Sequence, residues 1–201
     1  MFLNVKFFVE VLQTPVSNVK FFQLAPGEYF LCTIKISFYL GLLFSVPYVL
    51  SQILLFLIPG LNVSERKVTL FLFSSSFLLF SVGLLFAYYI LVPAALKFFL
   101  SYGSEIIEPL LSFEQYFGFI SVLFFYVGLV FQLPILQVIL SAVKFVSGKQ
   151  MLSNLSYVVL FSTIVGAVLT PSADPLTQLL LAAAIVFLYI VGALLAILLQ
   201  S

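Results

Sequence analysis

QYFGFISVLFFYVGLVFQLPILQVILSAV, residues 115–143, contains no charged residue. A helix needs roughly 20 mostly apolar residues to cross a bilayer, and this stretch is longer than that. Four other stretches of the chain are also charge-free: 36–64, 68–96, 150–173 and 175–201. None shows the alternation of apolar and polar residues that is typical of membrane strands. The sequence therefore predicts an all-α fold, a polytopic transmembrane helix bundle with five spans.

The overall composition supports a membrane protein and disfavours several other classes. Hydrophobic residues make up 64% of the chain and charged residues 7%, against roughly a quarter charged in soluble domains. The net charge of +1 offers no field that would attract nucleic acid. The chain has one cysteine and no histidine, so we expect no internal disulfide, no metal site and no histidine chemistry. We expect no cofactor and no enzymatic activity.

Proline, glycine and capping residues divide the chain into a first segment and the spans. We expect an extramembrane segment over 1–28, followed by a single transmembrane helical domain over 29–201. Its spans are predicted at about 29–58, 68–99, 115–143, 153–169 and 175–199.

Three helix starts are predicted from capping patterns. Ser64 with Glu65 suits an N-cap and first turn of the second span. Ser112 has capping-box spacing to Gln115 at the third span. Asp174 as N-cap with Pro175 at the first helical position predicts the start of the fifth span. We expect the fourth and fifth spans to form an undersized hairpin around the turn at 170–175, because the fourth has few residues.

Loop charges predict the orientation, because lysine and arginine accumulate on the cytoplasm-like side of a membrane. The loops at 59–67 and 144–154 hold cations and are expected on that side. The acidic loop at 101–114 and the turn at 170–175 are expected on the opposite, lumenal-type side. Segment 1–28 then also lies on the lumenal-type side, which a further span before it would explain.

Several strings in this order resemble one family. They are FFQLAPGEYF (21–30), SVPYVLSQILLFLIPGL (45–61), Ser64-Glu65-Arg66, SSSFLLFSVGLLFAYYILVPAALKFFLSYG (74–103), FEQYFGF (113–119), GLVFQLPILQ (128–137) and VLTPSADPLTQ (168–178). The chain resembles TatC, the receptor subunit of the twin-arginine protein translocase, in its cyanobacterial and plastid branch. The resemblance extends from about residue 8 to the end of the chain.

The resemblance implies an architecture and a function. The family has six spans with both termini on the cytoplasmic or stromal side, so the family's N-terminal segment and first span are expected to be missing from this sequence. The implied function is to bind twin-arginine signal peptides and to move folded proteins across the membrane with proton-gradient energy. The implied partners are single-span subunits of the TatA type and TatB type, precursor proteins and further copies of the chain. A plastid thylakoid membrane is the expected location, with a cyanobacterial or bacterial inner membrane as the alternative.

Glu65 and Arg66 are the residues at which the resemblance places signal-peptide binding. A carboxylate suits this task because it accepts charge-assisted hydrogen bonds from guanidinium groups. The alternative is that Glu65 only stabilises the start of a helix through the helix dipole. Arg66 is also explained by the preference of cations for that side of the membrane.

Four further residues resemble a polar membrane site for partner subunits: Gln132, Thr170, Asp174 and Gln178. Gln132 lies in the middle of an apolar stretch, where a polar side chain faces other helices or a cavity. The alternative for Gln132 is a glutamine that bonds to a neighbouring backbone carbonyl near Pro134. The alternative for the other three is turn and cap chemistry alone.

A small-solute or ion transporter is the competing function. Such a protein lines its path with polar residues at mid-membrane depth. Here no charged residue lies centrally within the last three predicted spans, which disfavours this class. The motif GxxxxGK[ST] is also absent, which disfavours an ATP-driven pump.

Overall fold

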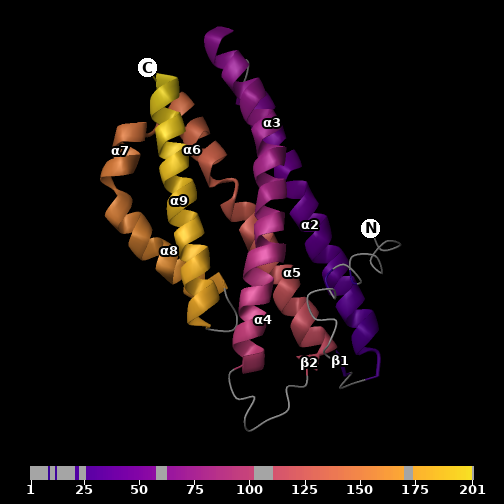
Figure 1. Ribbon diagram of the computed structural model, residues 1–201. Helices are drawn as coiled ribbons and strands as arrows, with labels where there is room; N and C mark the ends of the chain where they lie inside the picture. The colour runs from indigo at the N-terminus through magenta and orange to yellow at the C-terminus, as the bar shows by residue number, and fades with distance from the viewer. Residues whose placement is uncertain are drawn as a thin grey trace.

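The computed structural model describes residues 9, 12, 21–22, 26–57, 63–101, 111–169 and 174–200. Over these residues the fold is a bundle of long helices that run roughly along one axis (Figure 1). One end of the bundle, which we call the α7 end, holds α7, the start of α3 and the C-terminal end of α9. The two short strands and the start of α2 lie at the other, which we call the β end (Figure 1). The predicted all-α class is confirmed.

The first two helical segments cross the bundle in opposite directions. Helix α2 covers Glu28–Leu57 and contains Pro47. Helix α3 covers Val63–Phe86 and continues through the π-helix η4, Ala87–Leu91, into α4, Val92–Ser101. Pro93 is the second residue after η4; it lacks the N–H that an α-helix uses at that position, and its ring crowds the preceding turn. The helix therefore continues past Pro93 with a widened turn instead of ending there.

The next helical segment is interrupted in its middle. Helix α5 covers Phe113–Val130 and α6 covers Leu133–Ala142, with a turn at residues 131–132 between them. A short helix α7, Gly148–Ser153, follows and starts with a capping box between Ser147 and Gln150. The interruption ends two residues before Pro134, which cannot donate the hydrogen bond that would continue α5.

Helices α8 and α9 form the final hairpin. Helix α8 covers Leu155–Leu169 and α9 covers Pro175–Gln200. With 15 residues, α8 is about 22 Å long, less than the ~30 Å of a bilayer's hydrocarbon core. With 26 residues, α9 is long enough to cross. The prediction that both helices are undersized was therefore wrong for α9, because its apolar run continues almost to the end of the chain.

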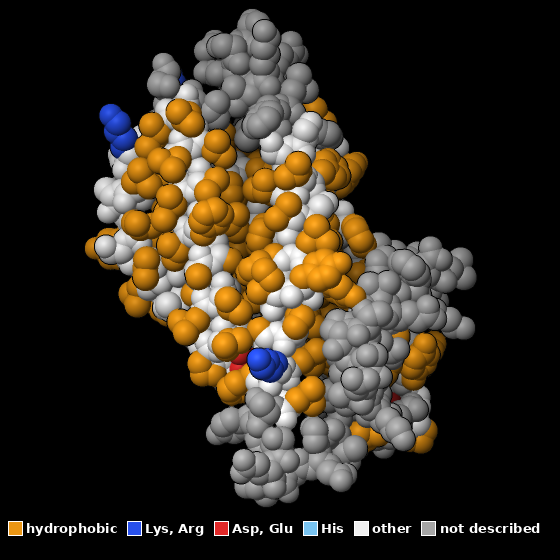
Figure 2. Space-filling model, viewed as in Figure 1, with side chains coloured by type: hydrophobic (Ala, Val, Ile, Leu, Met, Phe, Trp, Pro, Cys, Tyr) orange, Lys and Arg blue, Asp and Glu red, His pale blue; other side chains and the backbone are white. Residues whose placement is uncertain are grey.

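The outer surface of the bundle is apolar over most of its height. Within the described residues, four helical stretches have the length and hydropathy to cross a membrane: Glu28–Ile53, Ser74–Leu100, Phe113–Ala142 and Pro175–Leu198. Figure 2 shows hydrophobic side chains across the middle of one face, with charged side chains near its ends. This apolar outer surface suits the hydrocarbon core of a bilayer. The assignment of 1–28 to an extramembrane segment and of each span to the bilayer stays a prediction.

Helix α5 lies at the centre of the packing. Its side chains Phe117, Ile120, Leu123 and Val127 are fully buried, and α5 contacts α2, α3 and η4. Two residues of the first segment, Val9 and Leu12, are buried in the same cluster. The hydroxyl group of Tyr116 donates a hydrogen bond of 2.8 Å to the Leu12 carbonyl. Residues near the chain start therefore belong to the core of the bundle.

The start of α5 is capped by a residue of another helix. The predicted capping box at Ser112 and Gln115 was wrong, because the Ser112 side chain does not cap its own helix. Instead, Glu28 Oε1 accepts hydrogen bonds from the Glu114 backbone N–H, 3.1 Å away, and from Ser112 Oγ, 3.0 Å away. A carboxylate is favourable here because the positive end of the α5 dipole faces it.

Two further contacts hold the β end together near this cap. Strand β1, Phe21–Phe22, pairs in parallel with β2, Leu111–Ser112. The Lys35 ammonium forms an ion pair with the Glu114 carboxylate.

The start of the second span differs from the prediction: α3 begins at Val63, so Ser64 lies inside the first turn and is not the N-cap.

Candidate functional site

Gln132 occupies the turn between α5 and α6. The last α-helical hydrogen bond of α5 runs from the Phe131 N–H to the Val127 carbonyl, and the Gln132 N–H then donates to the Leu129 carbonyl only three residues back, each over 3.0 Å. The Gln132 side chain is 1% exposed. The break in the helix therefore places a primary amide inside the apolar bundle.

Both ends of the Gln132 amide bond to one residue of α3. Gln132 Oε1 accepts a hydrogen bond of 2.8 Å from Ser76 Oγ, and Gln132 Nε2 donates one of 3.1 Å to the Ser76 carbonyl. Ser76 is fully buried as well. Buried polar groups need such partners because an unpaired one costs about 1–3 kcal/mol. This geometry supports the alternative in which Gln132 bonds to a neighbouring backbone carbonyl.

Asp174 starts α9 as the sequence predicted. Its Oδ1 accepts a hydrogen bond of 2.7 Å from the Thr177 backbone N–H, and its other oxygen accepts one from the Thr177 hydroxyl. Both residues have no exposed surface. Asp174 therefore acts as the cap of α9.

Gln178 lies one turn further along α9 and bonds to the neighbouring helix. Its Nε2 donates a hydrogen bond of 3.2 Å to the Thr163 carbonyl of α8. Gly166 of α8 lies beside the same residue: a Cβ added there would be 3.0 Å from the Gln178 carbonyl oxygen. Gln178 thus holds the two helices of the hairpin together. Thr170 lies outside the described residues.

Glu65 and Arg66 lie in the first turns of α3, at the α7 end (Figure 1). Their side chains lie outside the described part of the structure. A place in the first turn of a helix is compatible with both interpretations of Glu65, signal-peptide binding and stabilisation of the helix start. The predicted site residues thus fall into three places: the start of α3, the α5–α6 turn and the α8–α9 hairpin.

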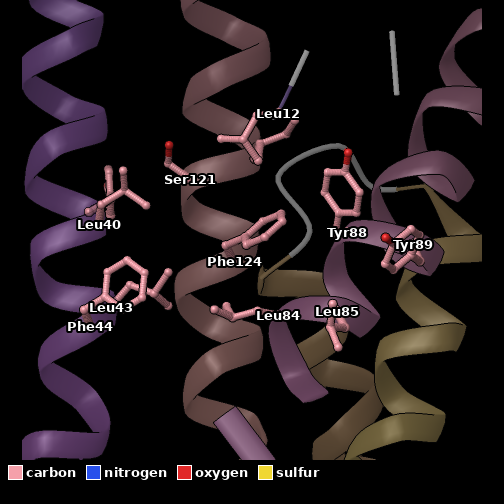
Figure 3. A pocket seen from close by; sticks show the side chains of 12 residues that line it. Leu12, Leu40, Leu43, Phe44, Leu84, Leu85, Tyr88, Tyr89, Ser121 and Phe124 are labelled. Carbon is pink, nitrogen blue, oxygen red and sulfur yellow. The ribbon is translucent and has the colours of Figure 1, made fainter. Parts of the chain in front are cut away.

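One cavity was not foreseen from the sequence. It measures about 250 Å³ and lies between α2, α3, η4 and α5. Figure 3 shows Leu40, Tyr88 and Phe124 around it, with the Ser121 hydroxyl group among its few polar atoms. The lining comes from segments far apart in the chain, and no local pattern marks them. The cavity is almost entirely apolar.

The buried charges do not form a solute path. Among the described residues, Glu28 and Asp174 are the buried charged side chains, and each lies at a helix start and bonds to a backbone N–H. The described residues also hold no cluster of His, Cys, Asp or Glu that could bind a metal ion. The molecule is therefore a multi-pass membrane protein whose polar groups join its helices to one another.

Comparison with known proteins adds the function to this architecture. The model of the family "Sec-independent protein translocase protein (TatC)" matches residues 1–184. A TatC-like protein of Trieres chinensis is 58% identical, over 94% of this chain and 72% of its own. The TatC protein of Synechocystis is 48% identical, over 95% of this chain and 75% of its own. The chloroplast TatC of Pisum sativum is 49% identical, over 92% of this chain and 53% of its own.

A solved structure agrees with these relatives. The crystal structure of the twin-arginine translocase receptor TatC in DDM superposes with a TM-score of 0.84 and 31% identity, over 97% of this chain and 88% of that one. These findings define a multi-pass component of a protein-transport machinery, not an enzyme. The chain belongs to the TatC family of the Sec-independent, twin-arginine translocase.

Proposed function

We propose that this chain is the receptor subunit of a twin-arginine translocase in a thylakoid membrane. In this role it binds the twin-arginine signal peptides of folded precursor proteins, which then cross the membrane with proton-gradient energy. The observation that carries the proposal is the likeness to a twin-arginine translocase receptor over nearly the whole chain. TatC proteins work with other subunits of the translocase.

Glu65 is proposed as the carboxylate that meets the arginine pair, with Arg66 beside it. The start of α3 supports this role, because it lies at an end of the bundle, where a water-borne signal peptide can reach it. A guanidinium pair offers several N–H donors in a planar arrangement, which a carboxylate accepts with two oxygens. The helix dipole favours a negative charge in the first turn, so capping and binding are compatible roles.

The α8–α9 hairpin is proposed as the docking surface for single-span subunits of the TatA type and TatB type. Helix α8 is too short for a full bilayer, and such a mismatch favours association with other helices. Gln178 and Thr170 are proposed to supply polar contacts to the partner. Asp174 and Gln132 are buried and bond within the chain, so they are proposed to serve the same surface by holding the start of α9 and the α5–α6 turn in place. Copies of the chain are proposed to associate with one another in the assembled translocase.

Glu65→Lys tests the receptor function. We expect this change to weaken precursor binding at least about tenfold, because a cation opposite two arginines is repulsive and like charges at an interface cost several kcal/mol. Glu65→Gln should have a smaller effect. The measurement is crosslinking of a twin-arginine precursor to the membrane-embedded chain.

Two controls accompany this measurement. A precursor with a Lys-Lys signal should crosslink poorly to the unchanged chain, and the amount of inserted Glu65→Lys protein should match that of the unchanged protein. Normal precursor crosslinking by Glu65→Lys would show that Glu65 serves only the helix start. Failure of both precursors on the unchanged chain would contradict the receptor function itself.

A further inference from the structure

Three helices meet around one buried glutamine near the α7 end. Gln137 of α6 is 5% exposed, and its Nε2 donates a hydrogen bond of 3.1 Å to the Tyr189 carbonyl of α9. The same nitrogen lies 3.8 Å from Met151 Sδ of α7. The Tyr189 hydroxyl group donates a hydrogen bond of 3.1 Å to the Met151 carbonyl. We call Gln137, Met151, Tyr189 and Gly192 the Gln137 junction.

Gly192 makes room for the glutamine amide. A Cβ added at Gly192 would lie 2.0 Å from Gln137 Oε1 and 2.7 Å from Pro134 Cα. Oε1 is buried and has no hydrogen-bond partner among the described residues. One Cα–H bond of Gly192 points where the Cβ would stand, so it points at Oε1, an arrangement known from Cα–H···O contacts between close helices. No other residue type allows α6 and α9 to approach this closely.

A second glycine brings α7 onto the same part of α9. A Cβ added at Gly148 would lie 2.8 Å from the Ala193 carbonyl oxygen and 2.6 Å from Ile197 Cγ1. Backbone atoms cannot move aside as a flexible side chain can. Helix α9 is therefore held on two sides, by α6 at Gly192 and by α7 at Gly148, over neighbouring turns.

The position of α8 depends on this grip, because α8 packs mainly on α9 (Figure 1). Its outer face is open: Tyr157, Phe161 and Val168 are 68%, 65% and 75% exposed. Its attachment to α9 is tight, through the Gln178–Thr163 hydrogen bond and the close approach at Gly166. The hairpin therefore follows α9 as one unit.

We propose that the Gln137 junction is a positioning site, which sets the rotation and depth of α9 on α6 and thereby places the α8–α9 hairpin for its partner helix. The inference rests on the proposed function in taking the hairpin as the docking surface. The junction does not include Thr170, Asp174 or Gln178, so the effect of the junction on a partner is transmitted through the position of α9.

Gly192→Ala and Gly118→Ala form a matched pair that tests this positioning. A Cβ at Gly118 of α5 would meet nothing within 4 Å, whereas one at Gly192 meets the α6 backbone. Spin labels on cysteines at Tyr157 of α8 and Phe38 of α2, in a Cys32→Ala background, report the distance between the hairpin and α2. We expect Gly192→Ala to shift or broaden the distance distribution and Gly118→Ala to leave it unchanged. An unchanged distribution in Gly192→Ala would overturn the proposal.

Gln137→Met serves as the second variant if Gly192→Ala protein does not accumulate. It keeps an unbranched side chain of similar length and removes the hydrogen bond to Tyr189, so we expect a broadened distribution here too. An unchanged distribution in this variant would likewise overturn the proposal.

Recovery of a TatB-type subunit with the chain separates this inference from the proposed function. We expect a several-fold loss of recovery in the variants that displace the hairpin. A displaced hairpin with full recovery would mean that the hairpin is positioned by the junction and is not the docking surface. In that case the proposed docking role of the hairpin is wrong, whereas the positioning role of the Gln137 junction holds.

Discussion

At the scale of single residues, the Ser76–Gln132 pair shows how this bundle tolerates a polar group in its interior. The amide uses an acceptor and a donor toward the same serine, and both residues are almost completely buried. A carboxylate at position 132 could not donate to the Ser76 carbonyl while it is ionised. Glutamine therefore keeps this contact independent of pH.

Ser76→Ala is expected to destabilise the bundle by about 1 kcal/mol, because it removes the hydroxyl group that bonds to Gln132 Oε1. The measurement is thermal unfolding of the purified protein in detergent. Ser81→Ala is the matched control on the same helix, since the Ser81 hydroxyl group is exposed and bonds to the Phe77 carbonyl of its own helix. Equal stability losses in the two variants would show that the cross-helix bond contributes nothing.

At the scale of elements, proline and glycine determine where the helices bend and meet. Pro134 separates α5 from α6 and brings Gln132 to the turn, and the π-helix η4 precedes Pro93. Gly83 of α3 lies against Phe131 at the α5–α6 turn, where an added Cβ would be 2.7 Å from Phe131 Cγ. The break at the α5–α6 turn and the close approach at Gly83 bring α3 into contact with this turn.

Gln178→Leu is expected to lower the recovery of TatA-type or TatB-type subunits with the chain, because it removes the amide that joins α9 to α8 and that a partner helix would meet. Hydrogen bonds between membrane helices contribute about 0.6–2 kcal/mol, so a several-fold effect is expected. The measurement is co-purification in a mild detergent.

Gln52→Leu is the control for this change, since Gln52 is an exposed glutamine on α2, outside the hairpin. Precursor crosslinking should stay normal in both variants. Undiminished recovery of both partners with Gln178→Leu would mean that the hairpin amide serves only the α8–α9 contact.

At the scale of the whole molecule, the distribution of charge between the two ends predicts how the bundle sits in its membrane. The α7 end carries Lys144 and Lys149, and the β end carries the carboxylates Glu28 and Glu114, of which Glu114 is paired with Lys35. Cations favour the stromal or cytoplasmic side. The α7 end is therefore expected to face the stroma.

Single cysteines in a Cys32→Ala background test this orientation. A cysteine at Phe145, which is 77% exposed, should react with a membrane-impermeant reagent from the stromal side only. A cysteine at the exposed Pro26 should react from the lumenal side only. Ser147 is avoided because it caps α7. Labelling at Phe145 from the lumen would reverse the predicted topology.

Features that depend on residues close together in the chain could be predicted from the sequence alone. Long apolar runs predicted membrane-length helices because hydropathy and helix length are local properties. Asp174 and Pro175 marked the start of α9, since a cap acts within one turn. The family was also evident from the sequence, because each of the strings that mark it is a short contiguous stretch. The capping box predicted at Ser112 is absent, because Glu28 of α2 accepts the hydrogen bonds at the start of α5.

The bonds between residues far apart in the chain are visible only in the folded molecule. Ser76 and Gln132 are 56 positions apart in the chain, and Glu28 lies 86 positions from the backbone N–H that it caps. The residues next to Gln137 and Gly192 in the sequence do not show that the Gln137 amide occupies the space that a side chain at Gly192 would fill. Such pairs depend on the rotation and depth at which packed helices meet. Those two quantities are set by all the side chains in an interface together, so no single segment of the sequence reveals them.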